Sequence, residues 1–222
     1  MEDESYIKKL EHVIKQMLTP LKNLPFHLVI ESLSGCKVES FDINDTKDET
    51  LLSNLIKAIK KAGQLVNQNG ILSQRANEVG NYIEAYVKAA LRTVGYQADI
   101  PSASSGSRKA TGYPDLEFID EFKRYNYIEC KTFNVESLTT TFRSFYLSPS
   151  DDFKVTKDAR HFAFSFEIFV DGTVDNKNKY KCKSWKIINL EKLSIDVKYE
   201  FNADNRRLYD KELIIAEGEF EN

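Results

Sequence analysis

The sequence predicts an α/β (α+β) protein, with helices in the first part of the chain and a sheet in the second. Three observations lead to this prediction. Apolar residues recur every three or four positions in the first seventy residues, an amphipathic segment covers residues 75–95, and runs rich in aromatic and β-branched residues follow residue 115. The 222 residues, 41% hydrophobic and 29% charged, suffice for one core and a helical appendage.

The early helices are predicted from their periodicity. Residues 7–18 carry an apolar stripe at helical spacing, and Pro20 and Pro25 follow it. Residues 26–35 end at a glycine, and residues 51–66 are again amphipathic after an acidic run. Three helices are therefore expected before residue 70.

A change of character follows. The helix predicted over residues 75–95 closes at Gly95, a residue suited to a helix C-terminus. Residues 96–100 read as a short strand, and residues 101–114, rich in Ser, Gly and Pro, read as a loop.

The remaining strands define the sheet. Residues 115–120 and 126–133 are close in sequence, so an antiparallel hairpin with a tight turn is the simplest pairing. Residues 161–172 form a long aromatic and β-branched run, typical of a buried central strand, and residues 180–190 form a further strand. Residues 195–201 fit either a helix or a strand.

Several classes of site and location are excluded. Cys36, Cys130 and Cys182 are odd in number and far apart, which argues against a disulfide framework or a zinc site, and the three histidines do not cluster. No run of about 18 apolar residues predicts a membrane span, and the acidic N-terminus is unlike a signal peptide. We expect a cytoplasmic protein, and the many Lys and Asn residues suggest a bacterial source with AT-rich DNA. The net charge of −3 does not decide for or against a nucleic-acid partner.

The hairpin carries the residues of greatest chemical interest. Alternate residues of a strand share a face, so Glu129 and Lys131 should be co-facial while Cys130 turns to the core. Asp115 opens the preceding strand after Pro114 and can lie opposite them. Carboxylates suit a divalent ion such as Mg²⁺, and a lysine can orient the nucleophile in phosphodiester hydrolysis.

This pattern, Pro114-Asp115 followed by Glu129-Cys130-Lys131, resembles the PD-(D/E)xK nuclease superfamily. The resemblance implies a restriction-endonuclease-like core, in which helices flank a mixed central sheet. It implies that Asp115 and Glu129 are metal ligands together with the Cys130 carbonyl, and that Lys131 positions the water. The implied cofactor is Mg²⁺, which Mn²⁺ can replace.

Many members of this superfamily also bring an acid from the helix before the hairpin. Glu84 fits that place, and Glu78 is the alternative. A chain of this size most resembles type II restriction endonucleases. That resemblance implies a homodimer that cleaves double-stranded DNA at specific sequences, leaves 5′-phosphate ends, and works with a cognate DNA methyltransferase.

The flanking segments contain candidate DNA-binding residues. Small hydrogen-bonding residues and basic side chains precede Asp115, and basic and aromatic residues are interleaved between residues 139 and 161. The candidates are Ser107, Arg108, Lys109, Arg143, Lys154, Lys157 and Arg160. Lysines at alternate positions from 177 to 183 could bind phosphates or protect a strand edge from mispairing.

We expect two parts of the chain to have different roles. Residues 1–72 would form a helical subdomain for packing, dimer contacts or DNA contacts, and residues 73–222 would form the nuclease core. Two other functions remain open at this point. One is a structure-specific repair or junction-resolving nuclease, and the other is a DNA-binding module with an inactive nuclease core.

Overall fold

The computed structural model of the protein describes residues 4–19, 21–134, 145–197, 205–208 and 213. The chain divides into two units, one of Leu24–Ser194 and one of the termini, Met1–Asn23 with Ile195–Asn222. No helix in the described part of the chain is long and apolar enough to cross a membrane.

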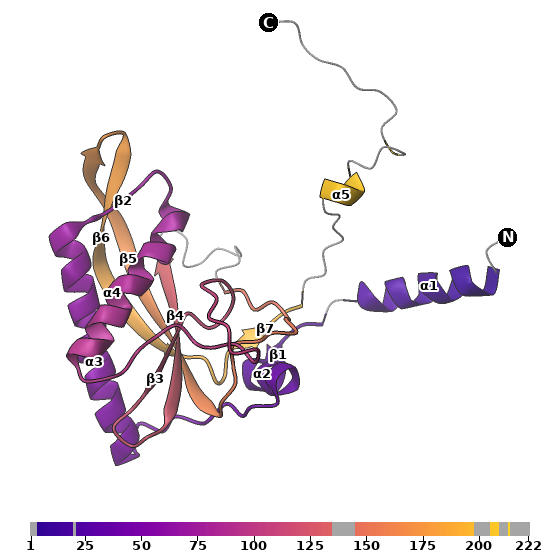
Figure 1. Ribbon diagram of the computed structural model, residues 1–222, viewed down its shortest axis with the longest axis horizontal. Coiled ribbons are helices and arrows are strands. Elements are labelled where there is room, and N and C mark those ends of the chain that lie inside the picture. The colour runs from indigo at the N-terminus through magenta and orange to yellow at the C-terminus, as the bar shows by residue number, and fades with distance from the viewer. Residues whose placement is uncertain (1–3, 20, 135–144, 198–204, 209–212, 214–222) are drawn as a thin grey trace, which may run out of the picture. The chain divides into compact units, whose positions relative to one another are not determined.

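The larger unit is built on a five-stranded sheet (Figure 1). Its strands are β2 (Ile71–Ser73), β3 (Leu116–Ile119), β4 (Tyr125–Phe133), β5 (Ala159–Val174) and β6 (Lys177–Asn189), in the order β2-β6-β5-β4-β3. The β4–β5 pair is parallel and the other pairs are antiparallel. The expected mixed sheet, the antiparallel β3–β4 hairpin and the central position of β5 are confirmed.

The helices are α1 (Glu4–Met17), α2 (Phe26–Ser34), α3 (Thr46–Asn69), α4 (Val79–Thr93) and α5 (Asn205–Leu208). A 3-10 turn at Ala76–Glu78 precedes α4, and the two-residue strands β1 (Leu24–Pro25) and β7 (Ser194–Ile195) pair with each other. The helices expected near residues 7–18, 26–35, 51–66 and 75–95 are confirmed, with Gly95 at a positive φ of 95°.

Two hydrophobic clusters hold the sheet between layers. α3 and α4 pack on one face (Figure 1), where Leu55, Ile83 and Phe164 are fully buried. α2 and the loops on the other face contribute to a second cluster that includes Phe26 and Tyr127. The sheet is thus covered on both faces.

α3 begins where the side chain of Asp45 caps the helix. The Asp45 carboxylate accepts hydrogen bonds from the backbone N–H groups of Lys47 and Asp48, at 2.9 and 3.1 Å. The boundary expected after residue 72 falls between two helices, α3 and α4, that share one core. A separate role for residues 1–72 stays a prediction.

The prediction of a short strand over residues 96–100 is wrong. Asp99 and Glu117 exchange both backbone hydrogen bonds, at 3.0 and 2.8 Å, but this is an isolated bridge to β3. Pro101, which follows directly, lacks the N–H that a longer ladder would use. The ambiguous segment 195–201 starts in β7, and residues 198–204 lie outside the described residues.

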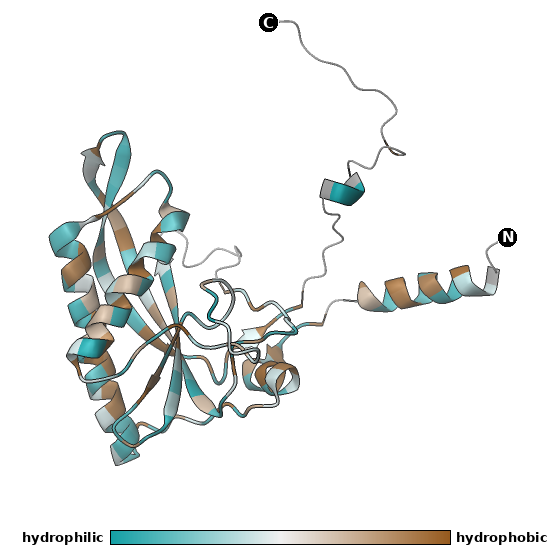
Figure 2. Cartoon of the chain, in the orientation of Figure 1, coloured by the Kyte–Doolittle hydropathy of each residue, from teal (hydrophilic) through white to brown (hydrophobic). Residues whose placement is uncertain are grey.

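α1 is amphipathic (Figure 2), and its large apolar side chains are exposed. They are Tyr6, Ile7, Leu10, Val13, Ile14 and Met17. In β6 the lysines at alternate positions do share a face, because Tyr180 and Cys182 between them are buried. Lys181 pairs with Asp171 at 2.6 Å and Lys183 with Glu167 at 3.2 Å, so these two ammonium groups contact β5.

A buried ion cluster joins α3 to the hairpin. The Asp48 side chain is 3% exposed and lies 2.7 Å from Arg124 Nη1 and 3.1 Å from Arg160 Nε. Arg124 also pairs with Asp120 at 2.7 Å, and Asp120 Oδ1 accepts the backbone N–H groups that shape the turn between β3 and β4. This cluster fixes one end of the hairpin.

We predict that Asp48→Ala destabilises the fold strongly. Two guanidinium groups would lose their shared buried partner, which costs about 3–5 kcal/mol. Glu49→Ala, at the next and exposed position of α3, is the control and should change stability by less than about 0.5 kcal/mol. Urea denaturation of the two variants measures this, and equal losses would contradict the prediction.

Candidate active site

Asp115 and Glu129 face each other across the β3–β4 hairpin. The register pairs Leu116 with Ile128, so Asp115, one step earlier, comes opposite Glu129. Asp115 Oδ2 accepts a hydrogen bond of 2.7 Å from the backbone N–H of Cys130. The Asp115 carboxylate is therefore held at the strand that carries Glu129.

Lys131 lies on the same face of β4 as Glu129. Its Nζ is 2.7 Å from Glu129 Oε1, and the two side chains are 27% and 7% exposed. Cys130, between them, is buried in the cluster under α3 and α4. The structure thus brings together Asp115, Glu129 and Lys131, as the alternation of the strand predicts.

Glu129 has an oxygen without a partner. Its Oε2 is buried and accepts no hydrogen bond within the described part of the chain. Burial, and next the nearby Asp115 carboxylate, raise the pKa of Glu129 from 4.5 to about 7. Burial also raises the pKa of Asp115. Lys131 neutralises only part of the negative charge that the two carboxylates carry when they are ionised.

Glu84 extends this acid cluster from α4. Burial raises its pKa to about 7, and the Asp115 carboxylate is the next largest cause. Glu78 has a different environment, because its Oε2 accepts a hydrogen bond of 2.6 Å from the Ser73 hydroxyl. Of the two candidate helix acids, Glu84 is the one near Asp115.

The donor groups suit a hard divalent cation. Within the described residues, no three His, Cys, Asp or Glu side chains converge closely enough to hold a metal by themselves. Mg²⁺ typically uses one or two protein carboxylates and completes its shell with water and substrate phosphate. Asp115, the free oxygen of Glu129 and the Cys130 carbonyl fit that requirement.

Lys154 is buried close to the same acids, which the sequence did not indicate. Only 3% of Lys154 is exposed, and its Nζ donates a hydrogen bond of 3.3 Å to the carbonyl of Lys109. Its flanking residues, Phe153 and Val155, are buried in the cluster beneath α2. In the sequence, the apolar residues on both sides of Lys154 are the one indication of burial. They do not predict whether the lysine side chain itself points into the protein or into solvent.

The other predicted DNA-binding residues have different environments. Lys109 pairs with Asp152, and the Ser107 hydroxyl lies 3.2 Å from Asp152 Oδ2. Lys157 is exposed. The Arg160 guanidinium, 13% exposed, is engaged with Asp48 instead. Arg143 lies outside the described residues, and the DNA contacts of all of these residues stay predictions.

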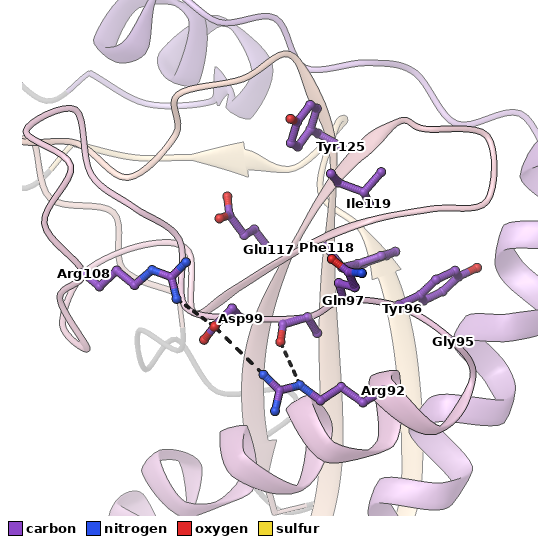
Figure 3. A pocket seen from close by; sticks show the side chains of 11 residues that line it. Arg92, Gly95, Tyr96, Gln97, Asp99, Arg108, Glu117, Phe118, Ile119 and Tyr125 are labelled. Carbon is purple, nitrogen blue, oxygen red and sulfur yellow. Dashed lines mark hydrogen bonds and ion pairs between the residues drawn. The ribbon is translucent and has the colours of Figure 1, made fainter.

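Arg108 lies at a pocket of about 660 Å³ beside β3 (Figure 3). Its Nη1 is 2.7 Å from Asp99 Oδ2, and Arg92 Nη2 approaches the same oxygen at 4.0 Å. Lys88 contacts Asp99 Oδ1 at 2.6 Å. Glu117, which also lines this pocket, lies in β3 two residues after Asp115, which directly precedes the strand. Arg92 and Lys88 belong to α4, whose other face is apolar, so the periodicity of the sequence predicts the helix but not these contacts with Asp99.

A buried histidine lies on this side of the sheet without a catalytic arrangement. His161 Nδ1 is 2.6 Å from the Tyr113 hydroxyl, and the two rings stack at 5.9 Å. Burial lowers the pKa of His161 to about 3, so the ring is neutral. The pair packs with Phe26 and Tyr127, and its evident role is to support the loop that precedes Asp115.

Comparisons with known proteins identify the family of the chain. The model of the type II restriction enzyme MjaV family matches residues 20–212. Type II restriction enzyme MjaV of Methanocaldococcus jannaschii is 40% identical over 232 aligned residues, which cover 98% of each chain. The tetrameric restriction endonuclease SfiI bound to cognate DNA is 12% identical, with a TM-score of 0.38 over 68% of this chain and 69% of that chain. The first two matches confirm the resemblance to type II restriction endonucleases. The chain belongs to the type II restriction enzyme MjaV family.

Proposed function

We propose that this chain cleaves double-stranded DNA at specific sequences, and that Asp115 and Glu129 hold the divalent cation it requires. Membership of a type II restriction enzyme family supports the reaction. The observation that supports the site is the buried Oε2 of Glu129, which has no hydrogen-bond partner in the described part of the chain, beside the half-buried carboxylate of Asp115. Burial of such an oxygen costs free energy unless a cation binds to it.

The cation proposed is Mg²⁺, with Mn²⁺ as a substitute. When bound, it would offset charge on the phosphate and lower the pKa of a water molecule. Asp115 and Glu129 would orient it together with the Cys130 carbonyl. Lys131, a charged and partly exposed group at 2.7 Å from Glu129, would position the attacking water. Attack on phosphorus would leave a 5′-phosphate and a 3′-hydroxyl.

The basic residues around the site are proposed to hold the DNA backbone. Arg108 and Lys109 lie on the loop before Asp115, and Lys157 lies on the segment before β5. Each ammonium or guanidinium that pairs with a phosphate adds a salt-dependent contribution to affinity. Arg108 and Lys109 already contact Asp99 and Asp152, which would fix their direction before DNA arrives.

A second copy of the chain is proposed to cut the other strand. The described residues of one chain contain one Asp115–Glu129–Lys131 cluster, and a two-fold dimer would match a palindromic site. The exposed apolar row of α1 is a surface that a second copy could cover. A methyltransferase of the same specificity would protect the host DNA, and both enzymes would act in the cytoplasm. A bacterial source stays a prediction.

We predict that the protein cuts phage DNA into discrete fragments in the presence of Mg²⁺. Sequencing of the fragment ends should show one recognition sequence and 5′-phosphates. Asp115→Asn and Lys131→Met should each lower the cleavage rate at least about 100-fold, because each removes a group that acts on the reacting phosphate. Random cutting or a preference for branched DNA would instead favour a structure-specific nuclease.

We predict different outcomes for the two helix acids. Glu84→Gln should lower the rate of cleavage about tenfold or more, because it removes a carboxylate near Asp115. Glu78→Gln should leave that rate within about threefold, because Glu78 contacts Ser73. Single-turnover cleavage of one defined duplex measures both, and the opposite ranking would remove Glu84 from the site.

We predict a pH-dependent stability for the metal-free protein. The pKa of Glu129 is about 7 in the folded state and near 4.5 when unfolded, so the folded state holds its proton more tightly. Wild-type stability should therefore fall relative to Glu129→Gln as pH rises from about 4.5 to 7, and the difference should stay constant above that range.

Urea denaturation in EDTA across this range measures the difference. A divalent cation at pH 8 should restore the stability of the wild-type protein but should have much less effect on Glu129→Gln. If the stability of the two proteins changed with pH in the same way, Glu129 would not be the acid whose pKa is raised.

A further inference from the structure

Lys154 is a buried lysine whose ammonium group forms no ion pair in the described part of the chain. Its Nζ donates to the Lys109 carbonyl at 3.3 Å, and no carboxylate lies within ion-pair distance among the described residues. Lysine is almost never fully buried unless it is paired. A position that costs the fold free energy in this way is a candidate for function.

The acids around Lys154 are those of the active site. Its electrostatic neighbours are, in order of strength, Asp115, Glu129 and Glu84. Lys131 contacts Glu129 directly at 2.7 Å, whereas Lys154 lies near all three acids and forms no ion pair with them in the described part of the chain.

We propose that Lys154 is a positioning residue of the active site, a second lysine that acts through the acid cluster and through the Lys109 peptide without touching the DNA. This inference rests on the proposed function and deepens it. It also changes the role expected for Lys154 from the sequence, where it was a candidate for a direct DNA contact.

Charge arithmetic gives the reason for a second lysine. With Glu84, Asp115 and Glu129 ionised, Lys131 and Lys154 leave the cluster one negative charge in excess, and a divalent cation would turn this into one positive charge. Without Lys154 the loaded cluster would be neutral. A phosphodiester gains negative charge as water attacks, so a surplus positive charge held beside it favours the transition state.

The hydrogen bond to Lys109 adds a second effect. Lys109 lies on the loop that carries Arg108 and leads to Asp115. By holding the Lys109 carbonyl, the Lys154 ammonium ties this loop to the acids. If DNA binding moved this loop, the Lys154 ammonium would move with it relative to the acids.

The test uses full-length Lys154→Met, which keeps most of the side-chain volume and removes the charge. Lys60→Met, on the exposed surface of α3, is the control with the same change of charge. We expect Lys154→Met to lower the single-turnover cleavage rate about 100-fold at pH 8 in Mg²⁺, and its Kd for the duplex in Ca²⁺ to stay within about threefold. Lys60→Met should match the wild type in both.

Metal uptake provides a readout that does not depend on activity. Calorimetry with Mn²⁺ alone should show binding to Lys154→Met at least about threefold tighter than to the wild type, since a repelling charge has been removed. Loss of Mn²⁺ uptake together with DNA binding would show a structural role only and would overturn the proposal, as would wild-type cleavage by Lys154→Met.

A double variant tests whether Lys154 acts through the acids. Glu84→Gln with Lys154→Met restores the net charge, so its loss of rate should be smaller than the product of the two single losses. Independent losses that multiply would contradict the proposal. If the wild-type protein cleaves no DNA at all, the proposed function fails, while the Mn²⁺ measurement still decides whether Lys154 acts on the acids.

Discussion

The crowding of carboxylates at the β3–β4 hairpin is the constraint on which the rest of the site depends. Asp115, Glu129 and Glu84 come from three elements, and burial raises the pKa of each. Like charges in a poorly hydrated place repel one another, so the fold must supply cations or protons. The 2.7 Å hydrogen bond from the Cys130 N–H to Asp115 and the Lys131–Glu129 pair are the fixed part of that compensation. A divalent cation would neutralise the remaining negative charge, so catalysis would depend on whether the three acids are ionised.

Much of the fold follows from local rules. The amphipathic helices, the hairpin, the central strand and the shared face of Glu129 and Lys131 depend on periods of 3.6 and 2, which the sequence displays directly. The convergence of Asp115 with Glu129 also follows, because a short hairpin fixes its own register. These features involve residues close together in the chain.

The features that the sequence did not predict depend on contacts between distant residues. Lys154 was expected on the surface, and its burial is decided by the packing of Phe153 and Val155 under α2. Arg160 was expected at the DNA, but Asp48, far away in the chain, holds its guanidinium. The strand expected at residues 96–100 reduces to one bridge, since pairing is decided by the partner strand and by Pro101. Periodicity indicates which face is apolar, but it does not identify the partner of a charge.

The parallel pairing of β4 with β5 has a consequence for the segment that joins them. Antiparallel strands can be joined by a tight turn, but parallel strands require a crossover of a dozen residues or more. The segment between Phe133 and Ala159 is therefore long by geometric necessity, and one end of it follows directly on the strand of Glu129. The same crossover carries Phe153, Lys154 and Val155, which are buried. The detour that parallel pairing imposes on the chain therefore returns core side chains, and a lysine near the acids, to the hairpin from which it started.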